Sequence, residues 1–594
     1  MTGGWAAATA PGAGWSGRST GRPGSWSPGS CSSRSPTSGS RPTPSRGGAR
    51  PALKGALWKL SALALSLGLA AACDPASLVL KQGPQKGGAV VEAIVGEAQS
   101  LNPLFAEEDN ARDIDSLVYQ GLISVDAGQS PVPVLARSLR VSDDRLTYTA
   151  RLRTDVSWAD GQPFSAEDVL FTFHSLQDPA YDGPQGTFWR DVRVELAGID
   201  EVRFVLKAPS ASFPYALRQR IIPQHIFKGV VLSGMAQDAH SGVHAFGTGP
   251  FMVQSISENK NTVVLVRNPH AGVARNLDRF EFRCYPTLAD AVDAVSRGEA
   301  DAVGALQPPQ LGTLVRRPDL QVNELRTFSF ATALFNVSPE MSVYFNPPAV
   351  RQALVQAVDR KAVLSVLDGR ADPAPGPVPP TDWAYDREAA GKYPYDPRVA
   401  QQTLDSTGWV RPPGGSAVRQ RGGKEFSISM VTADSYPYVQ VADLLVKEFA
   451  AVGVQLTVDV VPSTVLVSRY LVGKKYQMAL LAFDNGPDPD QFGLWDSSNS
   501  TDPLNFSSPL LPKQALIDKD LEDGRAAIDH KQRKAAYSDF QDLMSDAAPG
   551  IFLYEPHYAY IVSKRVHGVR TNPVVEPVDR FQYITDWWVD VKRG

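Results

Sequence analysis

Hydrophobic and polar residues alternate most clearly between Arg145 and Pro179. Leu146, Tyr148, Ala150 and Leu152 alternate with polar residues, which is the pattern of a strand with one buried face. The Asp-Gly turn within residues 158–163 ends this period. Ser165 then stands three residues before Asp168, immediately ahead of an apolar run. This spacing predicts a capping box and a helix that starts after Ser165.

The same reasoning predicts α/β structure along the rest of the chain. Apolar residues favour strands at 89–95 and 280–285, and Ile551 to Tyr560 indicates further strands. Residues 438–452 have one apolar stripe and end at a glycine, after which 454–460 alternates as a strand. A helix that leads directly into a strand is typical of an α/β lobe.

Two further helices are expected in the second half of the chain. Residues 350–360 place Val350, Leu354 and Val358 on one apolar face, with Arg351 and Arg360 pointing elsewhere. Asp396 and Pro397 form an N-cap and first-turn proline for a helix that ends near Gly408.

The composition is that of a globular protein with a large core, except at the N-terminus. The chain has 594 residues, of which 43% are hydrophobic and 21% charged, enough for two lobes or more. Residues 1–52 consist mainly of Gly, Ser, Pro, Arg and Ala and contain no acidic residue. We therefore expect this leader to be disordered or absent from the natural product, with translation starting near Leu53.

Residues 53–72 have the pattern of a secretory signal. Lys54 and Lys59 precede an uncharged apolar run that ends in Leu-Ala-Ala-Ala before Cys73. The run is too short to span a bilayer. The cleavage region resembles a lipobox, so Cys73 is the expected lipid-bearing residue, followed by a tether over 73–87. The alternative is ordinary signal cleavage beside an incidental cysteine.

Charge and cysteine content narrow the function classes. Removing residues 1–72 deletes eight cationic and no acidic residues, which changes the net charge from −4 to −12. An acidic exported protein is not expected to bind nucleic acid or to dock electrostatically on anionic lipid. The remaining thiol, Cys284, lies in an alternating strand and is predicted to be packed.

Several motifs occur in an order that resembles one known family. The run "RLTYTARLRTDVSWADGQPFSAEDV" begins at Arg145, and "LNPL" at Leu101, "GTGPF" at Gly247 and "VRQALVQAVDR" at Val350 accompany it. Together they resemble the family 5 extracellular solute-binding proteins, the peptide, dipeptide and nickel receptors of bacterial ABC importers. Arg145 and Asp155 replace glycines that are usual in that pattern.

The resemblance implies an α/β, two-lobed periplasmic binding protein of type II, hinged, with an extra subdomain. Lobe I is expected to comprise 88–118, 247–330 and 557–594, with the extra subdomain at 119–246. Lobe II is expected at 331–556.

The resemblance also places the ligand site. In the peptide receptors an Asp in the loop corresponding to residues 483–492 accepts hydrogen bonds from the ligand's α-ammonium. Asp484 is the predicted counterpart, with Phe483, Asn485 and Gly486 beside it and Asp488 as the alternative acceptor. Leu481 stands where the family commonly has an aromatic residue, so the stacking seen with short peptides is not expected here.

The implied function is capture of an oligopeptide or dipeptide between the lobes and delivery to a membrane permease with its ATPases. We expect a monomer without cofactor, metal or catalytic activity, exported and held to the membrane by lipid. One alternative is a receptor for a nickel chelate, a sugar or haem on the same scaffold. Another is a secreted hydrolase that uses Asp484 and Asp488 as an acid pair.

His240 and His244 are spaced i,i+4 beside Asp238, a spacing that would allow metal binding on a helix. Gly242 lies between them and no third ligand follows, so a surface loop is the expected structure.

Overall fold

The computed structural model describes residues 83–97, 100–183, 185–273, 276–415 and 417–590. The leader, the signal segment and Cys73 lie outside the described residues. The described residues from Pro84 onward fall within one compact unit. Within the described ranges, none of the helices has the length and apolar character that crossing a bilayer requires.

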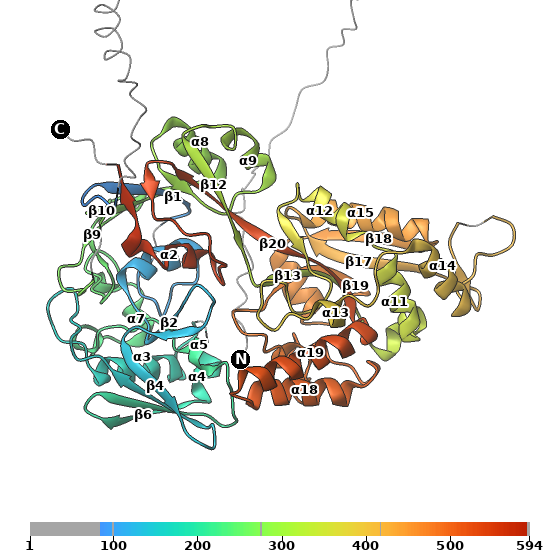
Figure 1. Ribbon diagram of the computed structural model, residues 1–594, viewed down its shortest axis with the longest axis horizontal. Helices are drawn as coiled ribbons and strands as arrows, with labels where there is room; N and C mark the ends of the chain where they lie inside the picture. Colours follow the sequence, from blue (N-terminus) through green and yellow to red (C-terminus); the bar gives the residue numbers. More distant parts are fainter. Residues whose placement is uncertain (1–82, 98–99, 184, 274–275, 416, 591–594) are drawn as a thin grey trace, which may run out of the picture. The chain divides into compact units, whose positions relative to one another are not determined.

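A twelve-stranded mixed sheet runs through this unit, and the long strand β20 (Gly550–Ser563) connects its two halves (Figure 1). The first part of β20 pairs with β13 (Ser329–Phe335) and β14 (Ala371–Pro373). Its last part pairs with β11 (Ala302–Val303) and β12 (Leu320–Arg326). The predicted strands at 551–560 are therefore one continuous strand shared by both halves.

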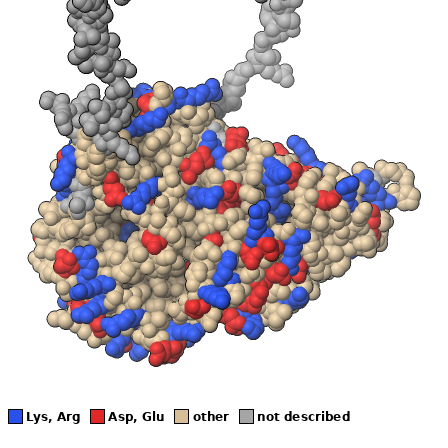
Figure 2. All heavy atoms as spheres, viewed as in Figure 1, with Lys and Arg blue, Asp and Glu red and all other residues tan. Residues whose placement is uncertain are grey.

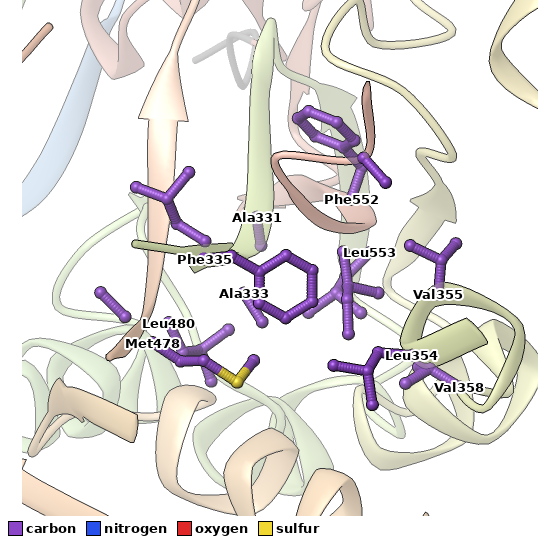
Figure 3. Close-up of a cluster of buried hydrophobic side chains, with 14 of the residues drawn as sticks. Ala331, Ala333, Phe335, Leu354, Val355, Val358, Met478, Leu480, Phe552 and Leu553 are labelled. Carbon is purple, nitrogen blue, oxygen red and sulfur yellow. The ribbon is translucent and has the colours of Figure 1, made fainter. Parts of the chain in front are cut away.

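One half of the sheet forms the second core, whose members all lie between Phe330 and Tyr554. β17 (Ser427–Ala433) and β18 (Gln455–Val461) are parallel, and α15 (Tyr438–Ala451) connects them as predicted. β19 (Met478–Asp484) pairs with both β17 and β13. Figure 3 shows side chains of β13, β19, β20 and α11 (Pro348–Gln356) meeting in this core. The remaining α-helices of this half are α10 (Ser342–Phe345), α12 (Arg360–Val366), α13 (Arg387–Ala390), α14 (Pro397–Ser406), α16 (Ser463–Val465), α17 (Phe492–Trp495), α18 (Gln514–Ala526) and α19 (His530–Ala547).

The expectation of one apolar helical face through 350–360 needs two corrections. The helix stops at Gln356, and α12 begins at Arg360 because the Asp359 side chain caps it by accepting from the Lys361 N–H. Arg351 does not point away from the core. It is fully buried, and its guanidinium donates to the carbonyls of Phe345 and Ala547, so its polar groups are satisfied.

The other half forms the first core, and residues from both ends of the described chain contribute to it. β1 (Ala89–Val95) runs parallel to β10 (Arg279–Tyr285), followed outward by β9 (Thr262–Arg267) and β8 (Phe251–Ile256). Val90 and Phe280 pack with Tyr560 and Trp587 in this core. A smaller cluster forms under α8 (Leu288–Arg297) and α9 (Pro308–Leu314).

A buried ion cluster ties the C-terminal segment to this core. Arg580 donates to the carboxylates of Glu92 in β1 and Asp113 in α2 (Asp109–Val118). Tyr560 donates to Glu92 at 2.7 Å. Each buried carboxylate therefore has a cationic or hydroxyl partner, as burial of charge requires.

The segment that carries the first sequence pattern forms a separate four-stranded sheet, whose buried side chains, such as Tyr148 and Phe204, belong to the first core. Its order is β4 (Ala136–Val141), β5 (Thr147–Leu152), β7 (Glu201–Val205), β6 (Arg193–Gly198). The helix α3 (Ala166–Gln177) begins after Ser165 with the predicted capping box. Short helices complete this region: α4 (Gly186–Arg190), α5 (Phe213–Ala216), α6 (Gln224–Phe227) and α7 (Leu232–Met235).

The residues of the pattern have structural roles here. The Asp168 carboxylate accepts from the N–H groups of Ser165 and Gln224, both at 2.8 Å, and from Trp158 Nε1 at 3.3 Å. Asp168 therefore joins the turn, the start of α3 and the start of α6.

Charges of both signs occur across the face shown in Figure 2.

Candidate ligand-binding site

The chain passes between the two cores at residues 326–329, and two segments flank this crossing. On the second-core side, Asp484 pairs with Ser329 in the ladder of β19 and β13, and Asn485 N–H donates to the Phe328 carbonyl at 3.2 Å. On the first-core side, Val574 N–H donates to the Arg326 carbonyl at 2.8 Å. The loop after β19 and the segment 574–579 therefore both lie at the junction between the cores.

Asp484 ends β19 with its side chain exposed to solvent at this junction. Its carboxylate accepts from the Gly486 N–H at 3.3 Å and forms no ion pair within the described part of the chain. Surrounding protein desolvates the carboxylate and raises its pKa to about 6, and the negative charges of Glu576 and Asp579 add to this effect. Asp484 is accessible from solvent, is partly desolvated by the surrounding protein and has no cationic partner within the described ranges. Such a carboxylate is suited to accept a cation.

The neighbours of Asp484 differ in what they can contribute. Asn485 Nδ2 is buried and has no hydrogen-bond partner among the described residues. Gly486 has a φ of +65°, a conformation that glycine adopts without steric cost. Phe483 is buried in the second core, with its ring 5.5 Å from that of Phe330, so its side chain faces away from the junction.

Asp488 and Asp490, further along the loop, already have partners. Asp488 is buried and receives two hydrogen bonds from Arg533 of α19, at 2.9 and 2.6 Å. Asp490 pairs with Arg525 of α18 at 3.2 Å. These pairs anchor the loop to the second core and leave Asp484 as its unpaired carboxylate.

Three contacts connect the four-stranded sheet region to the loop after β19 and to the C-terminal end of α18. Ser212 Oγ donates to Asp490 at 3.1 Å, and the Ala211 N–H donates to the Arg525 carbonyl at 2.9 Å. Arg145 Nη1 donates to the Ala526 carbonyl at 2.8 Å. The two sides of the junction are therefore in contact at its rim.

The first-core side carries charged residues that sequence reasoning did not single out. Arg218 forms an ion pair with Asp579, and the negative charge of Asp579 contributes to the raised pKa of Asp484. Burial lowers the pKa of Arg220, whereas burial raises the pKa of nearby Asp115 to about 8. The sequence holds no signal for this grouping, because its members come from segments about a hundred residues or more apart.

The histidine pair shows no metal geometry. Within the described ranges, no group of three His, Cys, Asp or Glu residues is arranged to hold a metal ion. His240 Nδ1 lies 2.8 Å from Asp238, in a short turn of 3₁₀ helix over 239–241.

The fold defines a class of protein. Two α/β cores, joined by a crossing strand segment and by a shared long strand, form the periplasmic-binding-protein fold. The solved structure of the oligopeptide-binding protein AppA from Bacillus subtilis, in complex with a nonapeptide, matches with a TM-score of 0.66 at 24% identity, covering 86% of this chain and all of that one. NikZ from Campylobacter jejuni, in complex with Ni(L-His), matches with a TM-score of 0.66 at 23% identity, covering 84% of this chain and 99% of that one.

The sequence comparison gives the family. Residues 130–504 match the model of the bacterial extracellular solute-binding proteins, family 5, and the chain belongs to this family. The oligopeptide-binding protein AppA of Bacillus subtilis (strain 168) is 25% identical over 85% of this chain and 92% of its own length. The chain is thus an extracellular or periplasmic solute-binding receptor of the ABC-importer type. Because receptors of this family are not enzymes, the hydrolase alternative is wrong.

Proposed function

We propose that this receptor captures peptides between its two cores and delivers them to a membrane permease. The observation that carries the proposal is Asp484, an unpaired carboxylate at the junction whose neighbours Asp488 and Asp490 are both engaged elsewhere. A free α-ammonium is the cation that every linear peptide presents, and a charge-assisted hydrogen bond to it is short and strong. The peptide relatives support this assignment, including the dipeptide-binding protein of Escherichia coli (strain K12).

The proposed motion is a hinge closure of two lobes about residues 326–329 and the middle of β20. Lobe I comprises 88–118, 247–330 and 557–594 with the subdomain 119–246, and lobe II comprises 331–556. The separation of the two cores near 325–330 and 554–560 supports these boundaries. Glu576 lies close enough to Asp484 in this structure to raise the Asp484 pKa, so closure would hold a ligand between these two carboxylates.

The test compares a peptide with its N-acetylated form by isothermal titration calorimetry. Tri-alanine and longer alanine peptides are first screened against wild type. The shortest one that binds serves as the probe. Acetylation removes the ammonium, so wild type should lose at least about 2 kcal/mol of binding free energy on acetylation. Asp484→Asn should bind both forms with similar, weak affinity.

The matched control is Asp143→Asn, which removes an exposed carboxylate in the turn before β5. This variant should discriminate between the two peptides as wild type does. Equal binding of the free and acetylated peptides by wild type would overturn the ammonium role of Asp484. Binding of a nickel chelate, a sugar or haem with no response to any alanine peptide would replace the peptide assignment.

We also propose that the exported chain is a monomer held to the membrane by lipid on Cys73. The support is the sequence pattern of residues 53–73. Mass spectrometry of the membrane fraction should find a diacylglycerol mass on a peptide that begins at Cys73, and Cys73→Ser should release the protein. An N-terminus other than Cys73 without lipid would contradict the anchor.

A further inference from the structure

A second cavity lies within the second core, away from Asp484 and its loop. Its volume is about 410 Å³, within the range of small-molecule sites. It is bordered by the end of α11, the start of α12, the loop at 373–375, residues 387–395 and the C-terminal end of α19. Val355 and Phe552, which are labelled in Figure 3, form part of its apolar wall.

Arg360 reaches this cavity with an incompletely satisfied guanidinium. Its Nε donates to the Phe552 carbonyl at 2.7 Å. Neither of its terminal nitrogens has a hydrogen-bond or ion-pair partner within the described part of the chain. Desolvation lowers the Arg360 pKa to about 10, and no carboxylate offsets this effect.

Two buried arginines of the same half, Arg351 and Arg533, are saturated. Arg351 donates to three carbonyl groups from all three of its nitrogens. Arg533 has the two oxygens of Asp488 and the Gly524 carbonyl. Arg360, in contrast, is partly exposed and borders the cavity, so its terminal nitrogens remain available to an anion that enters it.

The remaining charges around the cavity reinforce this imbalance. Lys361 and Arg387 also border it, and neither forms an ion pair among the described residues. The acidic lining residue is Asp359, whose carboxylate already accepts from the Lys361 N–H at 2.9 Å. Tyr393 and Tyr395 add hydroxyl groups, and most other lining residues are apolar.

We propose that this cavity binds a small organic anion, a carboxylate on a compact apolar body, with its charge held by Arg360 and Arg387. The planar guanidinium fits a carboxylate through two parallel hydrogen bonds, and the apolar wall accepts the body of the molecule. This site is separate from the junction between the cores and selects the opposite charge. It stands independently of the peptide assignment, because none of its residues belongs to the loop of Asp484.

The experiment uses 4-fluorobenzoate as the probe and ¹⁹F NMR of the purified exported protein. Wild type should give saturable line broadening below about 10 mM probe. The neutral analogue 4-fluorobenzyl alcohol should bind at least about tenfold more weakly. Arg360→Gln and Arg387→Gln should each weaken binding of the benzoate about tenfold, and an electron-density map of crystals soaked in 4-bromobenzoate should place the carboxylate on Arg360.

The control Arg398→Gln removes an exposed cation on α14 that does not border the cavity, and should leave binding unchanged. Asp484→Asn should also leave it unchanged, so failure of the peptide proposal and failure of this one are distinguishable. Because Arg387 is exposed, its substitution tests the site even where Arg360→Gln unfolds the protein. Absence of saturable binding by wild type, or equal binding by wild type and Arg387→Gln, would overturn the proposal.

Discussion

Arg533 and Asp488 form a bidentate ion pair between α19 and the loop after β19, with Nη1–Oδ2 at 2.9 Å and Nη2–Oδ1 at 2.6 Å. Both side chains are buried, and Asp488 raises the pKa of Arg533. Removing one partner of such a pair leaves the other charged and desolvated. The pair therefore fixes the loop that presents Asp484.

We predict that Asp488→Ala lowers the free energy of unfolding by about 3–5 kcal/mol, because it leaves the Arg533 guanidinium unpaired. Urea denaturation followed by tryptophan fluorescence measures this. The exposed Arg153–Asp155 pair provides the control, and Asp155→Ala should cost less than about 1 kcal/mol. A loss for Asp488→Ala as small as that of the control would contradict a structural role for the buried pair.

The Asp484 pKa predicts how peptide affinity depends on pH. The interaction needs ionised Asp484 and a protonated α-ammonium, so affinity should be greatest near pH 7 and fall as pH decreases through about 6. At pH 5 the ionised fraction is about one tenth, which predicts about tenfold weaker binding. Calorimetry of an alanine peptide at pH 7.5 and 5.0 measures the change, and a flat profile in wild type would be inconsistent with this role.

The same raised pKa has an opposite effect on the folded protein without ligand. Asp484 binds its proton more tightly when folded than when unfolded, so its contribution to stability is fully present below pH 3.8 and is lost as pH rises through about 6. The stability of Asp484→Asn minus that of wild type should therefore be larger at pH 8 than at pH 4. Thermal unfolding at both values checks the sign.

The contact between Ser212 and Asp490 predicts a variant that favours the open form. The Ser212 hydroxyl donates across the junction at 3.1 Å, and its removal should cost the closed form about 1 kcal/mol. Ser212→Ala should weaken ligand affinity about fivefold. Calorimetry measures the affinity, and small-angle scattering without ligand should report a larger radius of gyration.

Ser406→Ala is the matched control for this prediction. Its hydroxyl donates to Thr403 within α14, so affinity and radius should stay at the wild-type values. Wild-type affinity in Ser212→Ala would show that this contact does not contribute to closure.

The GTGPF segment predicts a site of low tolerance to substitution. A Cβ added to Gly247 would lie 1.7 Å from the Val118 carbonyl oxygen at the end of α2. Gly247→Ala should therefore lower the free energy of unfolding by about 3 kcal/mol or more. In Gly312→Ala, by contrast, the added methyl group meets no atom within 4 Å, and α9 should gain up to about 1 kcal/mol. Similar stabilities of the two variants would contradict this packing.

Local patterns predicted much of the fold correctly. The alternation at 146–152, the capping box of Ser165 and Asp168, and the proline at the start of α14 each specify a local conformation through adjacent residues. Such signals need no knowledge of distant contacts. The family resemblance supplied the fold class, and the comparisons confirmed the family and the fold.

The interactions that tune the site could not be predicted in this way. The pattern at 350–360 predicts that Arg351 points away from the apolar face, yet Arg351 is buried because distant carbonyls satisfy it. Arg533 is buried because the distant Asp488 carboxylate satisfies it. The approach of Glu576 to Asp484 joins positions about ninety residues apart. Side-chain pairing of this kind depends on tertiary packing rather than on periodicity.

The second core comes from one continuous stretch of sequence and the first core does not, which affects the order in which the two halves fold. All members of the second core lie in one uninterrupted stretch, so that half can complete its packing as soon as Tyr554 is available. The first core still lacks Tyr560, Phe581 and Trp587 at that moment. Since synthesis and export deliver the C-terminus last, the half that begins the polypeptide is the half that finishes folding second.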